Sequence, residues 1–493
     1  MEKKELKPVG VFRYFDEICQ VPRPSKHEEQ IIAYFQEFGK KHGIETHTDE
    51  CGNVLMRKPA TPGMENKKTV ALQSHMDMVC DKRKDVDHDF MKDPIETEVK
   101  GDWLWAKGTT LGADNGIGCA TQLAILTDDT IQHGPLECLF TRDEETGLTG
   151  AFALKPGFLN ADFLLNLDSE DEGQIFIGCA GGVDTVGEWT YKEVPVPAGY
   201  YTAKVEVKGL LGGHSGGDIH LQRACANKIL CRYLTKIAKQ TDLYLCEIDG
   251  GNLRNAIAAY AYAIISVPSD DRHLLSTTLN IFAAEAKAEY AVSDPGLEMQ
   301  IHSEEPRTTA IDRETTTKLL QTIYALPHGV MAMSQDVEGL VETSTNLASV
   351  KMHPDHKILI CTSQRSSTNS SKEDIATMVE TVMKMGGAEV KHSDGYPGWK
   401  PNPHSAILNI ARESYVRLFG KEPLVLAIHA GLECGLFSDK YPGLDMISFG
   451  PTLRDVHTPN ERMEIPTVEL FWKHLLDILV NIPEKVESLG FRV

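Results

Sequence analysis

Residues able to bind a metal ion stand just beyond four short apolar runs of the sequence, and one more stands in a glycine-flanked turn. They are His75, Asp114, Glu145, Asp168 and His457. Carboxylate and imidazole ligands without a thiolate suit zinc, and also manganese or cobalt. This set of side chains therefore indicates chemistry assisted by metal ions.

The charge on these residues supports a metal site. Asp114, Glu145 and Asp168 in one cleft would repel each other, and without a counter-charge some of them would take up protons. Two divalent cations and one hydroxide would balance the three carboxylates. Metal ions held ~3.5–4 Å apart by a shared carboxylate are a recurrent device of hydrolases.

Asp77 follows His75 at a spacing that places both side chains on the same side of an extended chain. A histidine that binds a metal commonly donates its other ring N–H to a carboxylate, so Asp77 could orient His75. Each of these short motifs by itself is more typical of a surface pair or a turn. The metal hypothesis depends on their occurring together at the ends of strands.

The elements that must position these residues alternate along the chain. We expect strands at 69–73, 136–140 and 163–167, and a helix at 115–126. This alternation predicts an α/β unit with a largely parallel sheet, in which ligand sites form at the carboxyl ends of the strands. Ser25 and Glu28 have the spacing of a capping box that would open the helix following them.

Two segments rich in proline and glycine, near residues 194–199 and 394–401, indicate domain junctions. Between them we expect strands at 201–210, 258–267 and 357–362 and helices at 219–235 and 372–385. We therefore predict a discontinuous α/β domain, residues 1–184 and 399–493, and an inserted α+β domain, residues 185–398.

Composition excludes several other classes of function. The formal net charge is −21, which disfavours binding to nucleic acid or to an anionic membrane surface. The longest apolar run has ten residues, 256–265, too short for a membrane helix. The start of the chain lacks a secretory signal, and the 11 cysteines are scattered without a C-x-x-C pair. We expect reduced thiols and a cytoplasmic location.

The order of motifs along the whole chain resembles that of the aminoacyl-histidine dipeptidases, also called Xaa-His or cytosol non-specific dipeptidases. The motifs are HMDMV, GTTLGADNGIG, EETG, NLDSE, GCAGG, GGHSGG, GGNLRNAI, HAGLECGLF and the segment around His457. This family belongs to the co-catalytic zinc clan of aminoacylase and carnosinase. The resemblance implies a mixed-sheet zinc-peptidase catalytic domain with an inserted α+β lid domain. It also implies cleavage of unsubstituted dipeptides, including Xaa-His dipeptides.

The resemblance assigns a role to each candidate ligand. Asp114 would bind both metal ions, most commonly zinc in this clan, with manganese or cobalt as alternatives. His75 and Asp168 would complete one site, and Glu145 and His457 the other. A cis peptide bond is expected between Asp114 and Asn115.

The resemblance also implies the acid–base chemistry. Asp77 would brace His75, and Glu144 would be the general base. A water bridging the metal ions would lose its proton to Glu144, and the resulting hydroxide would attack the peptide carbonyl. Glu144 would then pass the proton to the leaving amine.

Three residues of the inserted domain are candidates for binding the substrate. By resemblance, His214 would stabilise the oxyanion. Asn255 and Arg365 would grip the substrate, and Arg365 would pair with its free C-terminal carboxylate. A lid that reaches both ends of the substrate would limit the substrate to a dipeptide. A homodimer is an open alternative to a monomer.

Two other functions stay open at the level of the sequence. The segment Gly213–Gly217 satisfies G-x-S-x-G between an expected strand and helix, as in a serine hydrolase with Ser215 as nucleophile. A metal-dependent binding protein could keep the ligands and lack turnover. Glu144 favours the enzyme, because metal ligands alone do not supply a base.

Overall fold

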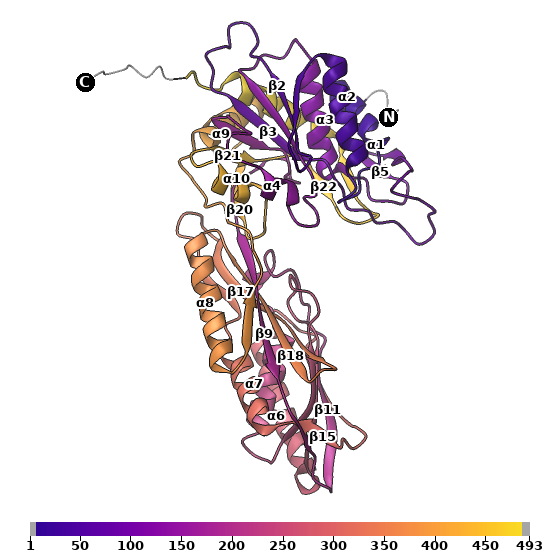
Figure 1. The fold of residues 1–493 in the computed structure, drawn as a ribbon, viewed down its shortest axis with the longest axis vertical. Coiled ribbons are helices and arrows are strands. Elements are labelled where there is room, and N and C mark those ends of the chain that lie inside the picture. Colours follow the sequence, from indigo (N-terminus) through magenta and orange to yellow (C-terminus); the bar gives the residue numbers. More distant parts are fainter. Residues whose placement is uncertain (1–5, 486–493) are drawn as a thin grey trace, which may run out of the picture. The chain divides into compact units, whose positions relative to one another are not determined.

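The computed structural model describes residues 6–485, which form two compact units (Figure 1). The first unit comprises the described residues up to Gly178, Pro401–Ala427 and those from Leu432 onward. The second comprises Cys179–Lys400 and Ile428–Gly431. It therefore begins before residue 185, because β9 (Gly181–Thr190) pairs along its whole length with β18 (Lys357–Ser366) of the same unit.

The first unit is built on an eight-stranded sheet with the order β1-β2-β6-β3-β7-β21-β8-β20. Its strands are β1 (Glu45–Thr48), β2 (Val54–Lys58), β3 (Val70–His75), β6 (Leu136–Thr141), β7 (Phe163–Asn166), β8 (Gln174–Cys179), β20 (Leu424–Ile428) and β21 (Asp445–Ser448). The adjacent strands β6, β3, β7 and β21 are parallel. The pairs β1–β2, β2–β6 and β21–β8 are antiparallel. The sheet is therefore mixed, and the parallel arrangement predicted from the sequence holds for its centre.

The central strands are buried because both of their faces are covered. Every residue of β3, β6 and β7 is buried, as expected for parallel strands with helices packed against the sheet. The helices of this unit are α1 (Val9–Cys19), α2 (Glu29–His42), α3 (Ala113–Thr127), α4 (Thr149–Ala153), α9 (Ala406–Phe419), α10 (Cys434–Lys440) and α11 (Ile465–Val480). A smaller sheet has the order β22-β23-β5-β4, with β4 (Thr97–Lys100), β5 (Trp103–Ala106), β22 (Leu453–Arg454) and β23 (Arg462–Glu464).

Two local predictions were wrong. Ser25 does not cap α2; its hydroxyl donates to Asp77 Oδ2 at 2.8 Å, and the cap residue Glu28 accepts the backbone N–H of Lys26 instead. The helix expected from residue 219 begins only at Ala226, because residues Ile219–Leu221 form a single 3₁₀ turn. In the first case, a distant carboxylate competes successfully with local capping.

The second unit contains a continuous antiparallel sheet with the order β14-β11-β13-β12-β17-β18-β9-β19, and β16 also pairs with β17. Its further strands are β11 (Tyr200–Lys208), β12 (Tyr244–Gly250), β13 (Ala261–Pro268), β14 (Glu298–Ser303), β16 (Gly329–Met333), β17 (Val341–His353) and β19 (Glu389–His392). Its helices are α5 (Ala226–Ile237), α6 (Arg272–Glu289), α7 (Arg313–Ala325) and α8 (Asn369–Met385). A separate ribbon pairs β10 (Glu193–Pro195) with β15 (Thr309–Ile311).

This sheet consists of two halves with the same βαββαβ order. One half is β11-α5-β12-β13-α6-β14, and the other is β9-α7-β17-β18-α8-β19. The halves join where β12 pairs with β17. The helix α5 packs on both α6 and α7, and α7 packs on α8, so the helices form one layer over the sheet. The inserted unit is thus an α+β domain, as the resemblance implies.

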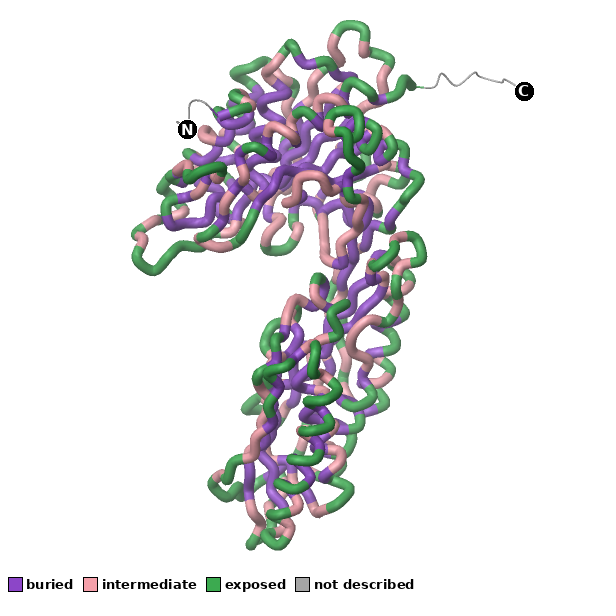
Figure 2. The backbone as a smooth tube through the Cα atoms, turned by 180° about the vertical axis from the view of Figure 1, so that it is seen from behind, coloured by how far each residue is buried: buried purple, intermediate pink, exposed green. Residues whose placement is uncertain are grey.

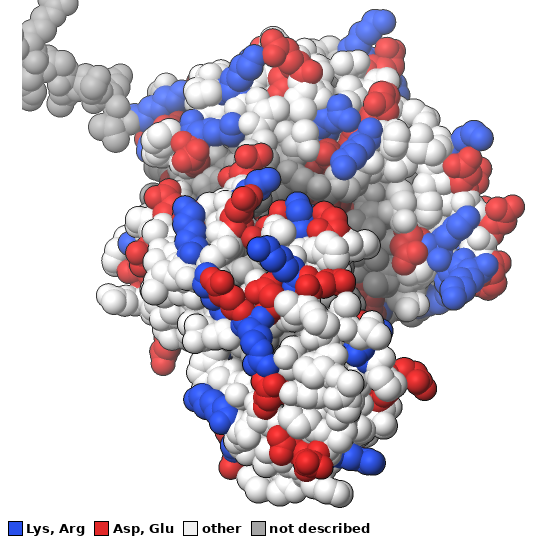
Figure 3. Space-filling view, turned by 60° about the horizontal axis from the view of Figure 1, so that its bottom comes forward, with Lys and Arg blue, Asp and Glu red and all other residues white. Residues whose placement is uncertain are grey.

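Each unit buries a core of its own (Figure 2). Acidic and basic side chains are interspersed on the face drawn in Figure 3. Among residues 6–485, no helix has the length and apolar character needed to cross a membrane.

His474 of α11 is a buried histidine that should make the first unit sensitive to acid. Its Nε2 lies 2.8 Å from the carbonyl oxygen of Ala411, and the rings of Tyr415 and Phe449 pack against it. Burial lowers the pKa of His474 to about 4. An unfolded histidine titrates near ~6.5, so the unfolded chain takes up this proton first. Stability is therefore lost as the pH falls from about 6.5 toward 4.

We predict that His474→Gln, which keeps an amide donor for Ala411 but cannot titrate, reduces this loss. Between pH 7.5 and 5.0, the free energy of unfolding should fall by about 2 kcal/mol less in the variant than in the wild type. Urea unfolding in the presence of a chelator measures the difference. The exposed His404→Gln is the control, and equal losses in wild type and His474→Gln would contradict the prediction.

Candidate metal centre

The candidate ligands meet at one edge of the parallel strands in the first unit. His75 is the last residue of β3, Glu144 and Glu145 follow β6, and Asp168 follows β7. The registers of these strands place Thr141 beside His75 and Asn166 beside Gln73. Parallel strands end at a common edge, so the loops that carry the polar side chains are neighbours.

The other two candidates come from a helix start and a loop. Asp114 is the second residue of α3, and its peptide bond to Asn115 is cis, as expected. His457 lies between β22 and β23 with a positive φ of 63°. From the sequence, His457 was expected to follow the strand that is β21 in the structure. The short strand β22 lies between β21 and His457, and the loop after β22 returns to the site.

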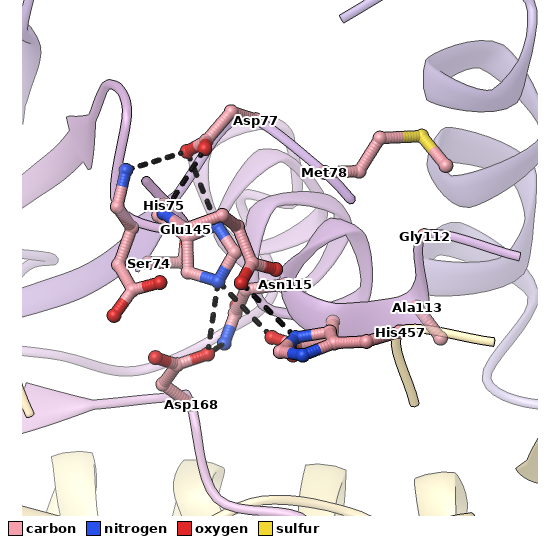
Figure 4. Close-up of polar contacts among 12 residues, drawn as sticks. Ser74, His75, Asp77, Met78, Gly112, Ala113, Asn115, Glu145, Asp168 and His457 are labelled. Atoms are coloured by element: carbon pink, nitrogen blue, oxygen red, sulfur yellow. Dashed lines mark hydrogen bonds and ion pairs between the residues drawn. The ribbon is translucent and has the colours of Figure 1, made fainter. Parts of the chain in front are cut away.

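Asp114 lies between two groups of candidate ligands: His75 with Asp168 on one side, and His457 with Glu145 on the other. Its Oδ1 is 3.0 Å from His75 Nε2, and its Oδ2 is 3.1 Å from His457 Nε2. His75 Nε2 is also 3.4 Å from an oxygen of Asp168, and His457 Nε2 is 3.0 Å from an oxygen of Glu145. In Figure 4 the labelled side chains of His75, Glu145, Asp168 and His457 point toward one another.

These separations fit a site that holds metal ions. Two ligand atoms of a tetrahedral ion with bonds of ~2.0–2.1 Å lie about 3.3 Å apart. The observed distances of 3.0–3.4 Å between nitrogen and oxygen atoms fall close to that value. His75, Asp114 and Glu145 also bring ligand atoms within 4.8 Å of one another. The donor set of imidazole nitrogen and carboxylate oxygen fits a divalent transition metal.

The pKa values show how strongly this centre attracts positive charge. Burial disfavours a charge on His75, but the carboxylates of Asp168, Asp114 and Asp77 outweigh it and hold the pKa well above its usual range. Hydrogen bonds to Asp114 and Glu145 raise the pKa of His457 to about 11. Protons on the two imidazoles thus balance part of the negative charge.

The pKa values of the carboxyl groups in this centre are shifted in opposite directions. Burial would raise the pKa of Asp114, but its contacts with His457 and His75 bring it far below its ordinary value. Burial raises the pKa of Asp168 to about 6. Burial also raises the pKa of Glu144 well above that of an ordinary glutamate, with contributions from Asp168, Glu433 and Glu145. A carboxyl group with a raised pKa suits proton transfer near neutral pH.

Asp77 connects His75 to the loop that carries the glutamates. Its Oδ1 lies 3.4 Å from His75 Nδ1 and accepts the backbone N–H of Glu144 at 3.0 Å. Its Oδ2 accepts the backbone N–H of Glu145 at 3.3 Å and the Ser25 hydroxyl. Asp77 is fully buried, so these contacts fix both the ring of His75 and the course of the glutamate loop (Figure 4).

Two residues with direct contacts to this region were missed at the sequence level. The Asn115 amide donates to the carbonyl of Leu167 at 2.9 Å and makes a close contact with Asp168 Oδ1. The buried Glu433 accepts hydrogen bonds from Gln73 at 2.6 Å and from Thr141 at 2.8 Å. Asn115 follows Asp114 directly and could have been considered, whereas nothing local connects Glu433 with Gln73.

In the second unit the backbone brings the segments of His214 and Asn255 together. The N–H of Ser215 donates to the Asn255 carbonyl at 2.8 Å, and His214 forms a β-bridge with Ala256. Arg365 lies in β18, and its charge is close enough to help burial lower the pKa of His214. The Asn255 side chain itself is exposed.

The structure gives the serine-hydrolase alternative no support. Ser215 is buried, and its hydroxyl has no hydrogen-bond partner among residues 6–485. A nucleophilic serine needs a base within hydrogen-bond reach. The ring of His214 is instead hydrogen-bonded to backbone, because its Nδ1 accepts the N–H of Gly217 at 2.9 Å.

Comparisons with known proteins agree with this geometry. Residues 71–481 match the model of peptidase family M20/M25/M40. The cytosol non-specific dipeptidase of Escherichia coli K12 is 43% identical over 484 residues, which cover 98% of this chain and 100% of that protein. The crystal structure of aminoacylhistidine dipeptidase from Vibrio alginolyticus is 43% identical, with a TM-score of 0.93 and 99% of each chain covered.

A more distant structure shares the fold alone. A tripeptidase from Staphylococcus aureus is 18% identical with a TM-score of 0.55, and the match covers 97% of this chain and 99% of that one. The long family match and the identity to full-length relatives confirm the resemblance inferred from the motifs. The chain therefore belongs to peptidase family M20/M25/M40 and is a peptide hydrolase.

Proposed function

We propose that this protein hydrolyses unsubstituted dipeptides, including Xaa-His dipeptides, with a pair of divalent metal ions. The observation that carries the proposal is the position of Asp114, with one carboxylate oxygen on the side of His75 and the other on the side of His457. The names of two relatives with 43% identity, both dipeptidases, support the substrate class. The name of the Escherichia coli relative, a cytosol dipeptidase, supports a cytoplasmic location.

Under this proposal His75 and Asp168 would hold one ion, Glu145 and His457 would hold the other, and Asp114 would bind both. Nitrogen and oxygen donors fit zinc best, with manganese or cobalt as alternatives. When bound, such a pair of cations lowers the pKa of a water molecule and polarises the peptide carbonyl. Asp77 keeps the ring of His75 oriented through Nδ1.

Glu144 is proposed as the general base. Its raised pKa, caused mainly by burial, makes its carboxylate a stronger base than an exposed glutamate. It takes the proton from the attacking water and transfers it to the nitrogen of the leaving amine. Because Asp77 accepts the backbone N–H of Glu144, the position of the base is linked to that of His75.

His214 is proposed as the donor that stabilises the developing oxyanion. Its Nδ1 accepts backbone N–H groups from Gly217 at 2.9 Å and from Gly216 at 3.3 Å. Burial and the charge of Arg365 lower the pKa of His214, which keeps the ring neutral. A neutral ring that accepts at Nδ1 carries its proton at Nε2. The backbone therefore selects the tautomer that donates from Nε2.

Arg365 is proposed to bind the C-terminal carboxylate of the dipeptide, and Asn255 to contact the substrate nearby. Arg365 is 8% exposed and donates to the Tyr396 hydroxyl at 3.0 Å, while its Nε has no partner among residues 6–485. No carboxylate in that part of the chain forms an ion pair with it. A buried guanidinium without a counter-ion suits a carboxylate ligand.

The proposal predicts that the stripped protein is inactive and that zinc or manganese restores cleavage of free dipeptides. Tripeptides and N-acetylated amino acids should be cleaved poorly. Metal analysis should find two ions per chain. Full activity after stringent removal of metal would contradict the proposal, as would an absence of dipeptide cleavage by the reloaded protein.

Glu144→Gln separates an enzyme from a metal-binding protein that lacks turnover. We predict that this variant keeps both metal ions, because the five proposed ligands are unchanged, and loses activity by at least about 10²-fold. Metal analysis and initial rates on one dipeptide measure the two effects. Near-normal turnover in Glu144→Gln would remove Glu144 as the base.

Arg365→Lys should weaken recognition of the substrate carboxylate, because lysine cannot form the bidentate pair. We predict kcat/KM for a free dipeptide to fall about 10–100-fold. The wild type should prefer the free dipeptide over its C-terminal amide, and the variant should lose most of this preference. The exposed Arg307→Lys is the control, and an unchanged preference in Arg365→Lys would exclude the assignment.

The charge on Asp168 should lower stability when metal is absent. Burial raises the pKa of Asp168 to about 6, so at pH 7.5 its ionised form opposes folding. We predict that Asp168→Asn raises the free energy of unfolding of the chelator-treated protein by about 1–3 kcal/mol. Zinc should stabilise the wild type more than the variant. Urea unfolding with and without zinc tests both statements, and a less stable metal-free variant would contradict the first.

A further inference from the structure

We infer that Glu461, together with Arg23, is a positioning residue that fixes the Asp114 carboxylate between its two groups of ligands. The inference rests on the proposed role of Asp114 as the ligand of both metal ions. Both residues are 2% exposed and belong to the first unit. Neither contacts the candidate ligands through a ligand atom.

Glu461 uses both carboxylate oxygens to hold the turn that precedes Asp114. Its Oε2 accepts the N–H groups of Leu111 at 2.7 Å and Gly112 at 2.9 Å. Its Oε1 accepts those of Ala113 at 2.8 Å and Asp114 at 3.3 Å. These four N–H groups precede the regular part of α3, because Asp114 and Asn115 have non-helical φ and ψ angles. They therefore need acceptors outside the helix, as buried backbone N–H groups do, and Glu461 supplies them.

Arg23 holds the same turn by its carbonyl side. Its Nη2 donates to the carbonyl of Gly112 at 2.5 Å, and its Nη1 donates to the carbonyls of Asp77 at 3.0 Å and Met76 at 3.2 Å. One guanidinium therefore connects the turn before Asp114 with the segment that follows His75. Glu461 thus accepts the N–H groups of the turn, and Arg23 donates to its Gly112 carbonyl.

Gly112 permits this close approach. It adopts a φ of 66°, and a Cβ atom there would lie 2.4 Å from Arg23 Nη2 and 2.8 Å from the sulfur of Met78. No side chain fits at this point without displacing the guanidinium. Gly112, Arg23 and Glu461 thus together fix the conformation of the turn before Asp114. Figure 4 shows Gly112 and Ala113 next to the site.

Glu461 also belongs to the loop that carries His457. The N–H of Glu461 donates to the Thr458 carbonyl at 3.0 Å, which closes a turn between the two residues. The loop therefore contacts Asp114 twice, through Glu461 at its backbone and through His457 Nε2 at its Oδ2, 3.1 Å away. This double contact sets the position of His457 relative to the Asp114 carboxylate.

A glutamine at position 461 would have nearly the same shape as the glutamate, but an NH₂ group would replace one of its two acceptor oxygens. Four N–H donors face the side chain, so the amide NH₂ group would meet donors and leave two of them without an acceptor in a buried place. We expect the turn to shift, and the two carboxylate oxygens of Asp114 to move from their present positions beside His75 Nε2 and His457 Nε2. Residues that orient metal ligands typically change metal affinity about 10- to 100-fold when substituted.

The test compares wild type, Glu461→Gln and the control Glu469→Gln, which replaces a half-buried glutamate of α11 that pairs with Lys473. The dissociation constants of both zinc ions are measured by competition with a chromophoric chelator. The visible spectrum of the cobalt(II) form reports ligand geometry, and kcat and KM are measured on one free dipeptide. Thermal unfolding of the metal-free proteins reports any change in stability.

We expect Glu461→Gln to bind metal about 10- to 100-fold more weakly, to change the cobalt spectrum and to lower kcat with little change in KM. Glu461→Asp keeps the charge but is shorter, so its metal affinity should lie between those of wild type and Glu461→Gln. A folded variant that is less stable yet has wild-type metal affinity and cobalt spectrum would overturn the inference. A wild type that binds no divalent cation would instead refute the proposed function.

Discussion

The mutual repulsion of buried carboxylates is the constraint on which the rest of the first unit depends. Asp114, Glu145 and Asp168 converge where little solvent screens their charges. Without metal, protons on His75 and His457 supply the counter-charge, because the carboxylates raise the pKa of both rings. A metal ion must displace those protons, so metal affinity should depend on pH. The site is therefore organised for cations before any cation binds.

Chain topology explains why so few residues suffice to build this centre. The parallel strands β3, β6 and β7 end at one edge, and each ends at a candidate ligand or is followed by one within a few residues. The antiparallel sheet of the second unit has no such common edge. Its candidate residues come from a turn at His214, a loop at Asn255 and the end of β18 at Arg365.

This difference also decides how much could be predicted from the sequence. The candidate ligands could be found because four of the five follow an apolar run and because the motifs occur in the order known for one family. The boundary of the second unit and the start of α5 were less certain, because local patterns do not show which strand a segment pairs with. The register around Arg365 became clear only from its pairing with Ser344 and Gly182.

The residues that hold the ligands were the least predictable, because their partners lie far away in the chain. Ser25 has the spacing of a helix cap, yet its hydroxyl binds Asp77, 52 residues away. Glu461 follows His457 in a polar loop and gives no sign of facing four backbone N–H groups. In such cases the partner of the side chain is a group that only the folded chain brings near it. The local sequence does not indicate that partner.

A layer of polar side chains beneath the candidate ligands explains how their positions along the sheet edge are kept in register. Gln73 donates to Glu433 and accepts from Asn166, and Asn166 accepts from the Ser448 hydroxyl at 2.5 Å. Gln73, Asn166 and Ser448 lie on β3, β7 and β21, and Glu433 precedes α10. Gln73 stands two positions before His75, and Asn166 two positions before Asp168. Burial raises the pKa of Glu433 to about 8, so near neutral pH it is mostly protonated and adds little charge to the centre. Apolar residues there could let the strands slide, whereas directional hydrogen bonds between neighbouring strands hold each ligand at one height along the sheet edge.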